Sequence, residues 1–281
     1  MNFHKAPQIY TGEVHLNVMD LKRSIQFYQE IIGFKVLEEA ANKAVLTADG
    51  KTPLLIIEQP ENVTPKMPHQ SGLYHFALLL PTRADLGAII KHFIQLQVRL
   101  GASDHLVSEA LYLSDPDGNG IEIYTDRDPS VWNWDNGNVA MSTDPLDGES
   151  IIAESAAQTW DGLPAETVMG HVHLHVAHLP ETEKFYNALG FEVVTNYPQA
   201  LFMSNGKYHH HLGLNTWNGV GAPKPATGSV GLQSFALVYP TEDVLNEALV
   251  KVEALGGKVE SNGSGFVTED PSGNRMILRV G

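Results

Sequence analysis

Two stretches that repeat each other decide how this chain folds: EVHLNVMDLKRSIQFYQEIIGFKV at 13–36 and HVHLHVAHLPETEKFYNALGFEV at 171–193. Each reads as an alternating apolar strand, a turn, a short amphipathic helix that carries a Phe-Tyr pair, and a further strand after Gly-Phe. The pairs are Phe27–Tyr28 and Phe185–Tyr186. The repetition predicts duplicated strand–helix–strand units.

A second duplication completes the pattern. GLYHFALLLPTRADLGAIIKHFIQ (72–95) resembles GLQSFALVYPTEDVLNEALVKVEA (231–254), and SDPDGNGIEIY (114–124) resembles EDPSGNRMILR (269–279). The chain therefore contains four similar units, each strand–helix–strands, and we expect them to pair into two compact domains of an α+β fold.

We name the units by their order in the chain. The first half, 1–124, holds module A (9–58) and module B (70–124), and the second half, 168–281, holds module A′ (168–216) and module B′ (229–281). Residues 125–167 break the pattern and are rich in Asp, Asn, Gly and Pro, which is typical of a long connection. Trp132 and Trp134 within it are expected to pack on a domain, because exposed tryptophan pairs are uncommon.

Composition and charge argue against several classes of partner and site. The chain has 281 residues, enough for about two domains. A formal charge of −15 repels phosphate backbones, so we expect no nucleic-acid partner. No apolar run is long enough for a membrane helix, and the start MNFHKAPQIYTG lacks the pattern of a signal peptide, so we expect a cytoplasmic protein without a membrane partner. With no cysteine and 13 histidines, any metal must be held by imidazole and carboxylate, which suits Fe(II), Mn(II) or Zn(II).

Two segments of module B carry candidate site residues. In 105–124, HLVSEALYLSDPDGNGIEIY, a DPDGN turn leads into a strand on which Glu122 points away from the face of Ile121 and Ile123. Glu122 could equally be a solvated strand carboxylate. His75 interrupts the apolar strand YHFALLL (74–80), where a hydrogen-bonded core histidine is the alternative to a ligand.

Module A′ contributes two histidine clusters. HVHLHV (171–176) places His171, His173 and His175 on one strand face, which is either a metal-binding face or an exposed polar one. YHHHLGLN (208–215) contains three consecutive histidines inside the chain, where an affinity tag would not sit. Only alternate members of such a run can share a face, so its register decides which side chain enters a site.

The four units, the Phe-Tyr…Gly-Phe pieces and the DPxGN turns resemble the vicinal oxygen chelate superfamily of glyoxalase, bleomycin resistance and extradiol dioxygenase relatives. The likeness covers nearly the whole chain apart from the connection. It implies that each module is a βαβββ unit and that two modules form a cup-shaped mixed sheet around one divalent metal. The ligands then come from the first and last strands of the modules.

One motif resembles the extradiol ring-cleavage dioxygenases more specifically. The chain has His105, five residues, Leu111–Tyr112, two residues, the turn Asp115–Pro116–Asp117–Gly118, three residues and Glu122. The departure from that family's pattern lies upstream, at Ser103. The resemblance implies that Glu122 is the metal carboxylate and that Tyr112 and His105 contact substrate.

The same resemblance points to first-strand ligands at His75 and His171, and in module A at Glu13 with His15 nearby. Module B′ has Ser234 and Ile277 at the corresponding positions and has lost both ligands. HHHLGL resembles the family's catalytic-histidine segment, with His210 in the catalytic position and His209 and His211 as its alternatives.

The way in which the modules pair decides the ligand set. If A pairs with B, the metal residues are His75 and Glu122 with Glu13 or His15, and no catalytic histidine is present. If B pairs with A′, one cup collects the complete extradiol set, which is His75, His171, Glu122, His105, Tyr112 and His210. We favour the pairing of B with A′ because of this complementarity, which leaves A and B′ as an empty structural cup.

The resemblance implies Fe(II)-dependent extradiol cleavage of a small aromatic diol by O2. Two imidazoles and one carboxylate leave open positions on Fe(II) for substrate and oxygen. His210 would accept a phenolic proton and later return it. The alternatives are a lyase, isomerase or thiol transferase using Zn(II), Ni(II) or Mn(II), for which Glu13 could be a further ligand, and a ligand-binding member without catalysis. The sequence leaves the oligomeric state open, with a homo-oligomer among the expectations.

Overall fold

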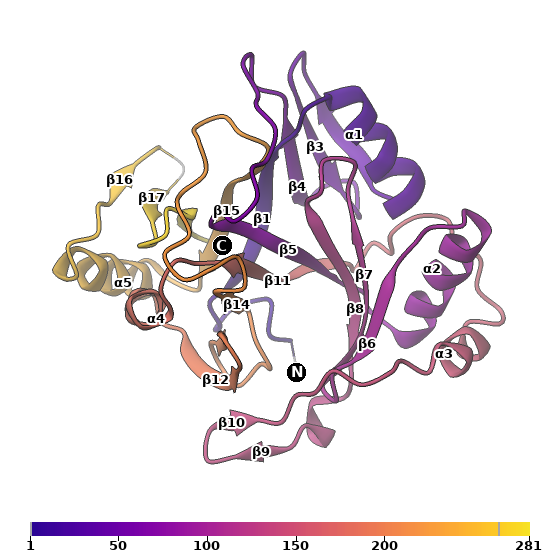
Figure 1. The fold of residues 1–281 in the computed structure, drawn as a ribbon. Helices are drawn as coiled ribbons and strands as arrows, with labels where there is room; N and C mark the ends of the chain where they lie inside the picture. Colours follow the sequence, from indigo (N-terminus) through magenta and orange to yellow (C-terminus); the bar gives the residue numbers. More distant parts are fainter. Residues whose placement is uncertain (1, 264) are drawn as a thin grey trace.

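The computed structural model describes residues 2–263 and 265–281, and two eight-stranded mixed sheets dominate it (Figure 1). The first sheet has the order β16-β17-β18-β15-β1-β4-β3-β2. Its strands are β1 (Tyr10–Asn17), β2 (Lys35–Glu39), β3 (Lys43–Thr47), β4 (Pro53–Glu58), β15 (Gly231–Tyr239), β16 (Glu260–Ser261), β17 (Phe266–Glu269) and β18 (Arg275–Val280).

The second sheet has the order β12-β13-β14-β11-β5-β8-β7-β6. Its strands are β5 (Gly72–Leu79), β6 (Gly101–Asp104), β7 (Ser108–Ser114), β8 (Gly120–Asp126), β11 (Val168–His175), β12 (Glu192–Tyr197), β13 (Ala200–Ser204) and β14 (Leu212–Asn215). The expected α+β fold of four paired strand–helix–strand modules is confirmed.

The sheets do not follow the two halves of the sequence. The second sheet joins module B to module A′, because β5 and β11 pair antiparallel with His75 opposite His173. The first sheet joins A to B′ through the antiparallel pair β1 and β15. The favoured pairing of B with A′ is therefore the one that the structure has.

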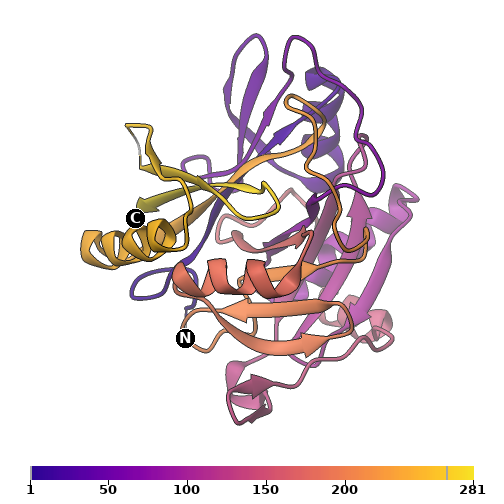
Figure 2. The same cartoon turned by 60° about the vertical axis from the view of Figure 1, so that its left-hand side comes forward.

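A helix accompanies the strands of every module, and Figure 2 shows two of these helices, α4 and α5, side by side. Local sequence sets where the helices begin, since Thr82 and Thr241 each accept a hydrogen bond from a backbone N–H of the first turn. The four helices are α1 (Leu21–Phe27), which continues as the π-helical turn η1 (Tyr28–Ile32), α2 (Arg83–Gln95), α4 (Leu179–Ala188) and α5 (Glu242–Ala254). None of the helices in residues 2–263 and 265–281 combines the length and hydrophobicity that a membrane span requires.

The repeated Phe-Tyr and DPxGN motifs meet each other in space. The hydroxyl of Tyr28 donates to Asp115 over 2.9 Å, and the hydroxyl of Tyr186 donates to Asp270 over 3.3 Å in the other half of the sequence. Each aspartate also accepts backbone N–H groups of its own turn. These buried bonds connect A to B and A′ to B′, while the sheets connect B to A′ and A to B′, so each module is tied to two others.

The connection after β8 crosses the surface as η2 (Pro129–Val131), a hairpin of β9 (Trp134–Asp135) and β10 (Asn138–Val139), and α3 (Gly148–Glu154). Trp132 is buried against Phe3 and its indole N–H donates to the carbonyl of Val107, and Trp134 packs on the same cluster. The expectation that both tryptophans pack on the protein is confirmed.

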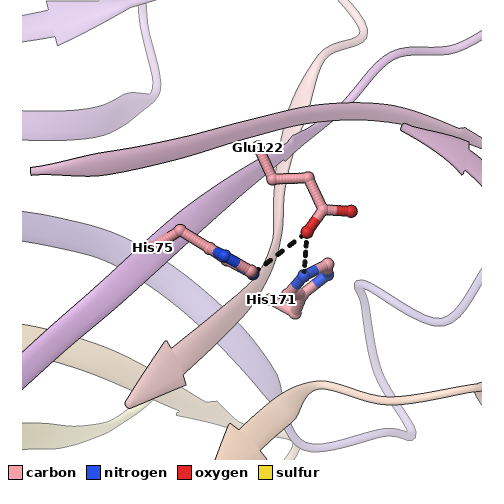
Figure 3. Close-up of side chains that lie close together, drawn as sticks. All are labelled: His75, Glu122 and His171. Atoms are coloured by element: carbon pink, nitrogen blue, oxygen red, sulfur yellow. Dashed lines mark hydrogen bonds and ion pairs between the residues drawn. The ribbon is translucent and has the colours of Figure 1, made fainter. Parts of the chain in front are cut away.

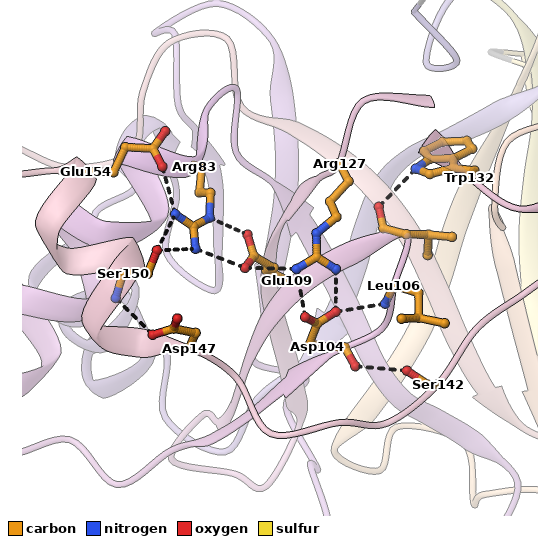
Figure 4. Close-up of polar contacts among 11 residues, drawn as sticks. Arg83, Asp104, Leu106, Glu109, Arg127, Trp132, Ser142, Asp147, Ser150 and Glu154 are labelled. Carbon is orange, nitrogen blue, oxygen red and sulfur yellow. Dashed lines mark hydrogen bonds and ion pairs between the residues drawn. The ribbon is translucent and has the colours of Figure 1, made fainter. Parts of the chain in front are cut away.

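Ion pairs hold the next part of the connection in place (Figure 4). The buried carboxylate of Glu109 on β7 contacts Arg83 at 2.6 Å and Arg127 at 3.1 Å, and Arg83 also reaches Glu154 of α3 at 2.7 Å. Arg127 pairs in addition with Asp104 of β6, whose backbone N–H and carbonyl exchange hydrogen bonds with Asp144. The connection is thereby fixed along the edge of the second sheet, beside the cavity described next.

Candidate metal centre

Three polar side chains from three neighbouring strands converge inside the second sheet (Figure 3). Oε2 of Glu122 on β8 lies 3.0 Å from Nε2 of His75 on β5 and 3.1 Å from Nε2 of His171 on β11. The ligand atoms all lie within 4.8 Å of one another, and all three residues are buried. The register of the strands produces this arrangement. Glu122 pairs with Ala77, which lies on the same face of β5 as His75. β11 pairs antiparallel with the other edge of β5 and brings His171 to the same place.

The charges of this triad suit a divalent cation. Burial lowers the pKa of His171, so its imidazole is neutral at pH 7. Burial alone would raise the pKa of Glu122, but the facing imidazoles of His171 and His75 lower it well below its ordinary value and keep the carboxylate ionised. A buried carboxylate of this kind needs a compensating positive charge. Nε2 of His75 is buried without a well-aligned hydrogen bond. Two nitrogens and one oxygen aimed at a common point fit a metal with several open positions.

His105 and Tyr112 stand together beside the triad. Nδ1 of His105 lies 2.6 Å from the carbonyl oxygen of Ser142, and Nε2 lies 2.6 Å from the hydroxyl of Tyr112. A carbonyl can only accept, so Nδ1 of His105 donates to Ser142, and in the tautomer with a single hydrogen on Nδ1 the Nε2 atom accepts from the hydroxyl of Tyr112. Burial, followed by the charge of Glu122, raises the pKa of Tyr112 well above its ordinary value, which keeps the hydroxyl protonated. Both residues line the cavity onto which His75 and Glu122 of the triad open.

The three consecutive histidines have three different environments. His210 lines the cavity, and its ring lies 4.2 Å from that of His171, centroid to centroid. His209 lies behind it against Asp126, and Nε2 of His211 contacts the carbonyl of Phe3. Burial, with the neighbouring His171 as the next cause, lowers the pKa of His210 well below its ordinary value. Of the three, His210 is the one that lines the cavity.

The cavity has a volume of about 290 Å³ and its walls are largely aromatic. The sequence analysis predicted the polar residues of this cavity but assigned none of its Phe, Trp, Met or further Tyr walls. Phe202, Trp217 and Tyr74 line it together with 141–143 of the connection. His173 also lines it, two positions after His171, so the alternation of histidines on this strand was the available signal.

A hydrogen-bond chain holds His173 in the wall. Nδ2 of Asn215 contacts Nε2 of His173 at 2.9 Å, and Oδ1 of Asn215 contacts Nδ1 of His175 at 2.7 Å. His171, His173 and His175 are all buried, so the alternative of an exposed polar face is wrong.

The other cup has no comparable cluster in the part of the chain that the structure describes. Glu13 pairs with Arg279 at 2.5 Å, and His15 pairs with Glu58 at 3.1 Å. Both residues belong to the sheet of A and B′, whereas the triad belongs to the sheet of B and A′. Neither Glu13 nor His15 is therefore brought to the triad as a third ligand.

Comparison with known proteins agrees with this geometry. The family model of the Glyoxalase/Bleomycin resistance protein/Dioxygenase superfamily matches residues 11–123 and 168–278. The chain belongs to this superfamily. The two matched ranges correspond to the two halves of the sequence and leave out most of the connection.

Individual relatives refine the placement within the superfamily. The chain is 44% identical over 276 residues to a protein of Bacillus subtilis (strain 168) named catechol-2,3-dioxygenase. This alignment covers 96% of this chain and 97% of the relative. It is 26% identical over 175 residues to biphenyl-2,3-diol 1,2-dioxygenase 3 of Rhodococcus globerulus, over 60% of this chain and 83% of the relative. The structure of glyoxalase I from Zea mays shares the fold, with a TM-score of 0.57, 17% identity, and coverage of 96% of this chain and 92% of that chain.

Proposed function

We propose that this protein is an Fe(II)-dependent extradiol dioxygenase that cleaves a small catechol-type diol with O2. The observation that carries the proposal is the buried triad of His75, Glu122 and His171, of which His75 and Glu122 line an aromatic-walled cavity. The relative that is 44% identical over nearly the whole chain, and is named catechol-2,3-dioxygenase, supports the same chemistry.

The metal would be held by Nε2 of His75, Nε2 of His171 and a carboxylate oxygen of Glu122. When bound, the Fe(II) ion lowers the pKa of a coordinated phenol and passes electron density to O2. Glu122 is the only charged ligand, so a divalent ion would leave the site with a net positive charge. A site of this charge suits a substrate that gives up protons as it binds. This ligand set also accepts Mn(II), and Zn(II) or Ni(II) would occupy it without supporting oxygen chemistry.

Three further residues would handle the substrate. His210 faces the cavity as a neutral imidazole and would take a phenolic proton, and later return it to the opening ring. Tyr112 stays protonated beside Glu122, and with His105 it would hydrogen-bond a substrate hydroxyl. His105 is held from behind by the carbonyl of Ser142, so a residue of the long connection fixes its tautomer.

The cavity also constrains the substrate. Its volume of about 290 Å³ lies at the small end of ligand sites, which favours a single aromatic ring. Phe202, Trp217 and Tyr74 would pack on the faces and edges of that ring, and stacked or edge-to-face contacts of this kind contribute about 0.5–1.5 kcal/mol each.

The test is anaerobic reconstitution with Fe(II), followed by oxygen uptake and formation of the yellow ring-opened product from catechol and substituted catechols. E122Q should lose both signals, whereas E58Q, which changes a carboxylate of the other cup, should keep them. Stoichiometric iron binding without oxygen uptake on any catechol would refute the proposal. Metal analysis of anaerobically purified protein separates iron from zinc or nickel.

A further inference from the structure

Behind His210 lies a chain of polar contacts that leads away from the cavity. Nδ1 of His210 is 2.8 Å from Nδ1 of His209, and Nε2 of His209 is 2.8 Å from Oδ1 of Asp126. His209 and His210 precede β14, and Asp126 is the last residue of β8. The chain thus joins the two modules that build the metal centre.

The direction of these hydrogen bonds follows from Asp126. An ionised carboxylate can only accept, and Asp126 also accepts the hydroxyl of Tyr208 at 3.2 Å. Nε2 of His209 must therefore carry a hydrogen, which in a neutral imidazole leaves a lone pair on Nδ1. That lone pair accepts from Nδ1–H of His210. Nε2 of His210 is then left with its own lone pair, and it has no hydrogen-bond partner among the described residues.

We propose that Asp126 and His209 are positioning residues that fix His210 in the tautomer whose Nε2 lone pair faces the cavity. This inference rests on the proposed function, because the lone pair matters only if His210 accepts a proton from the substrate. Packing supports the role. The ring of His209 is fully buried, 4.0 Å from the ring of Tyr208 and 5.2 Å from that of Trp132, centroid to centroid, so it has little freedom to turn.

Neither positioning residue belongs to the metal cluster, which comprises His75, Glu122 and His171. Their replacement should therefore leave metal binding intact. In D126N the amide can donate to Nε2 of His209, which reverses both hydrogen bonds and places a hydrogen on Nε2 of His210. The variant keeps the size and shape of the side chain but presents the wrong tautomer to the substrate.

The first measurement is steady-state kinetics of catechol cleavage by the iron-loaded enzyme. We expect kcat of D126N to fall by roughly 10²- to 10⁴-fold, the usual contribution of a general acid–base group, with KM for catechol within about threefold of wild type. H209F, which keeps a buried ring and removes both nitrogens, should also lose kcat. Y208F is the matched control, since it removes the other donor to Asp126 and leaves the carboxylate on His209. Wild-type kcat in folded, iron-loaded D126N and H209F would overturn the proposal.

The second measurement needs no activity. Nitrogen NMR of the imidazoles in zinc-loaded protein should show His210 protonated on Nδ1 in wild type and Y208F, and on Nε2 in D126N. An Nε2–H tautomer of His210 in wild type, or an unchanged Nδ1–H tautomer in D126N, would overturn the inference. If wild type cleaves no catechol, the proposed function fails by itself, and the NMR result still decides whether the contacts set the tautomer.

Discussion

Replacing Glu122 by glutamine removes the single formal charge of the proposed ligand set while preserving its shape. At a free metal concentration 100-fold above Kd, the bound metal should stabilise the wild-type fold by about 2.7 kcal/mol. The entropy of unfolding of a chain of 281 residues is about 0.6 kcal/mol/K. The metal should therefore raise Tm of the wild-type protein by about 5 °C.

In E122Q the same metal concentration should have almost no effect. Loss of a residue that only supports a ligand typically costs 10- to 100-fold in metal affinity, so loss of the charged ligand itself should cost at least ~100-fold. The free metal concentration is then about equal to the Kd of E122Q. Metal binding stabilises this variant by only about 0.4 kcal/mol, which raises its Tm by less than ~1 °C. The assay is anaerobic thermal unfolding with and without Fe(II), with Mn(II) as an air-stable substitute.

A matched control separates this effect from general damage. E109Q also replaces a buried carboxylate, but one that contacts Arg83 and Arg127 and lies outside the triad (Figure 4). It should lower stability by roughly 2 kcal/mol with or without metal, because it weakens charged hydrogen bonds. It should keep the full metal-dependent rise in Tm. An undiminished rise in E122Q, or its loss in E109Q, would refute the assignment of Glu122 as a ligand.

Three further changes test other parts of the structure. Burial, followed by the charge of Lys43, lowers the pKa of His15 to about 4, below its unfolded value of about 6.5, so its contribution to stability is lost as pH falls from 6.5 toward 4. Wild type should lose about 2 kcal/mol more than H15Q between pH 7 and pH 5 in urea unfolding, and equal losses would contradict this. G213A would place a Cβ 2.6 Å from Cγ of His173, so it should raise KM for catechol while iron loading stays unchanged, as kinetics and metal analysis can verify. Y112F should lower kcat about 10-fold or more without changing metal affinity, and an unaltered kcat would remove Tyr112 from the chemistry.

The sequence, together with the family resemblance of its motifs, was sufficient to predict the fold and the cluster of His75, Glu122 and His171. The duplicated segments defined the modules, and the strand alternation around Glu122 gave its face. Complementarity of the modules then favoured one pairing, since B lacked the third ligand and A′ carried an isolated histidine strand. The pairing of modules is a property of the tertiary structure. It could still be predicted, because only the pairing of B with A′ collects all the candidate residues in a single cup.

The walls of the cavity could not be predicted in the same way. Tyr74 lies one position before His75, so strand alternation alone would have pointed it to the opposite face, yet it lines the cavity. Residues 141–143 reach the site because an ion-pair network fixes the connection, which sequence periodicity cannot indicate. The register of 209–211 depends on contacts with Asp126 and Phe3, which lie far away in the sequence.

The arrangement of the modules explains why the candidate metal cluster lies in one cup and depends on both halves of the sequence. Each half of the sequence is tied internally by a buried tyrosine–aspartate hydrogen bond, and each sheet takes one module from each half. Either half alone therefore carries only part of the triad, with His75 and Glu122 in one and His171 in the other. The cup of A and B′ still contributes to the fold through its sheet, and Glu13 there is neutralised by Arg279 instead of serving a metal. A single metal centre needs only one complete set of ligands, so the ion pair of Glu13 with Arg279 in the second cup is compatible with the proposed site in the first.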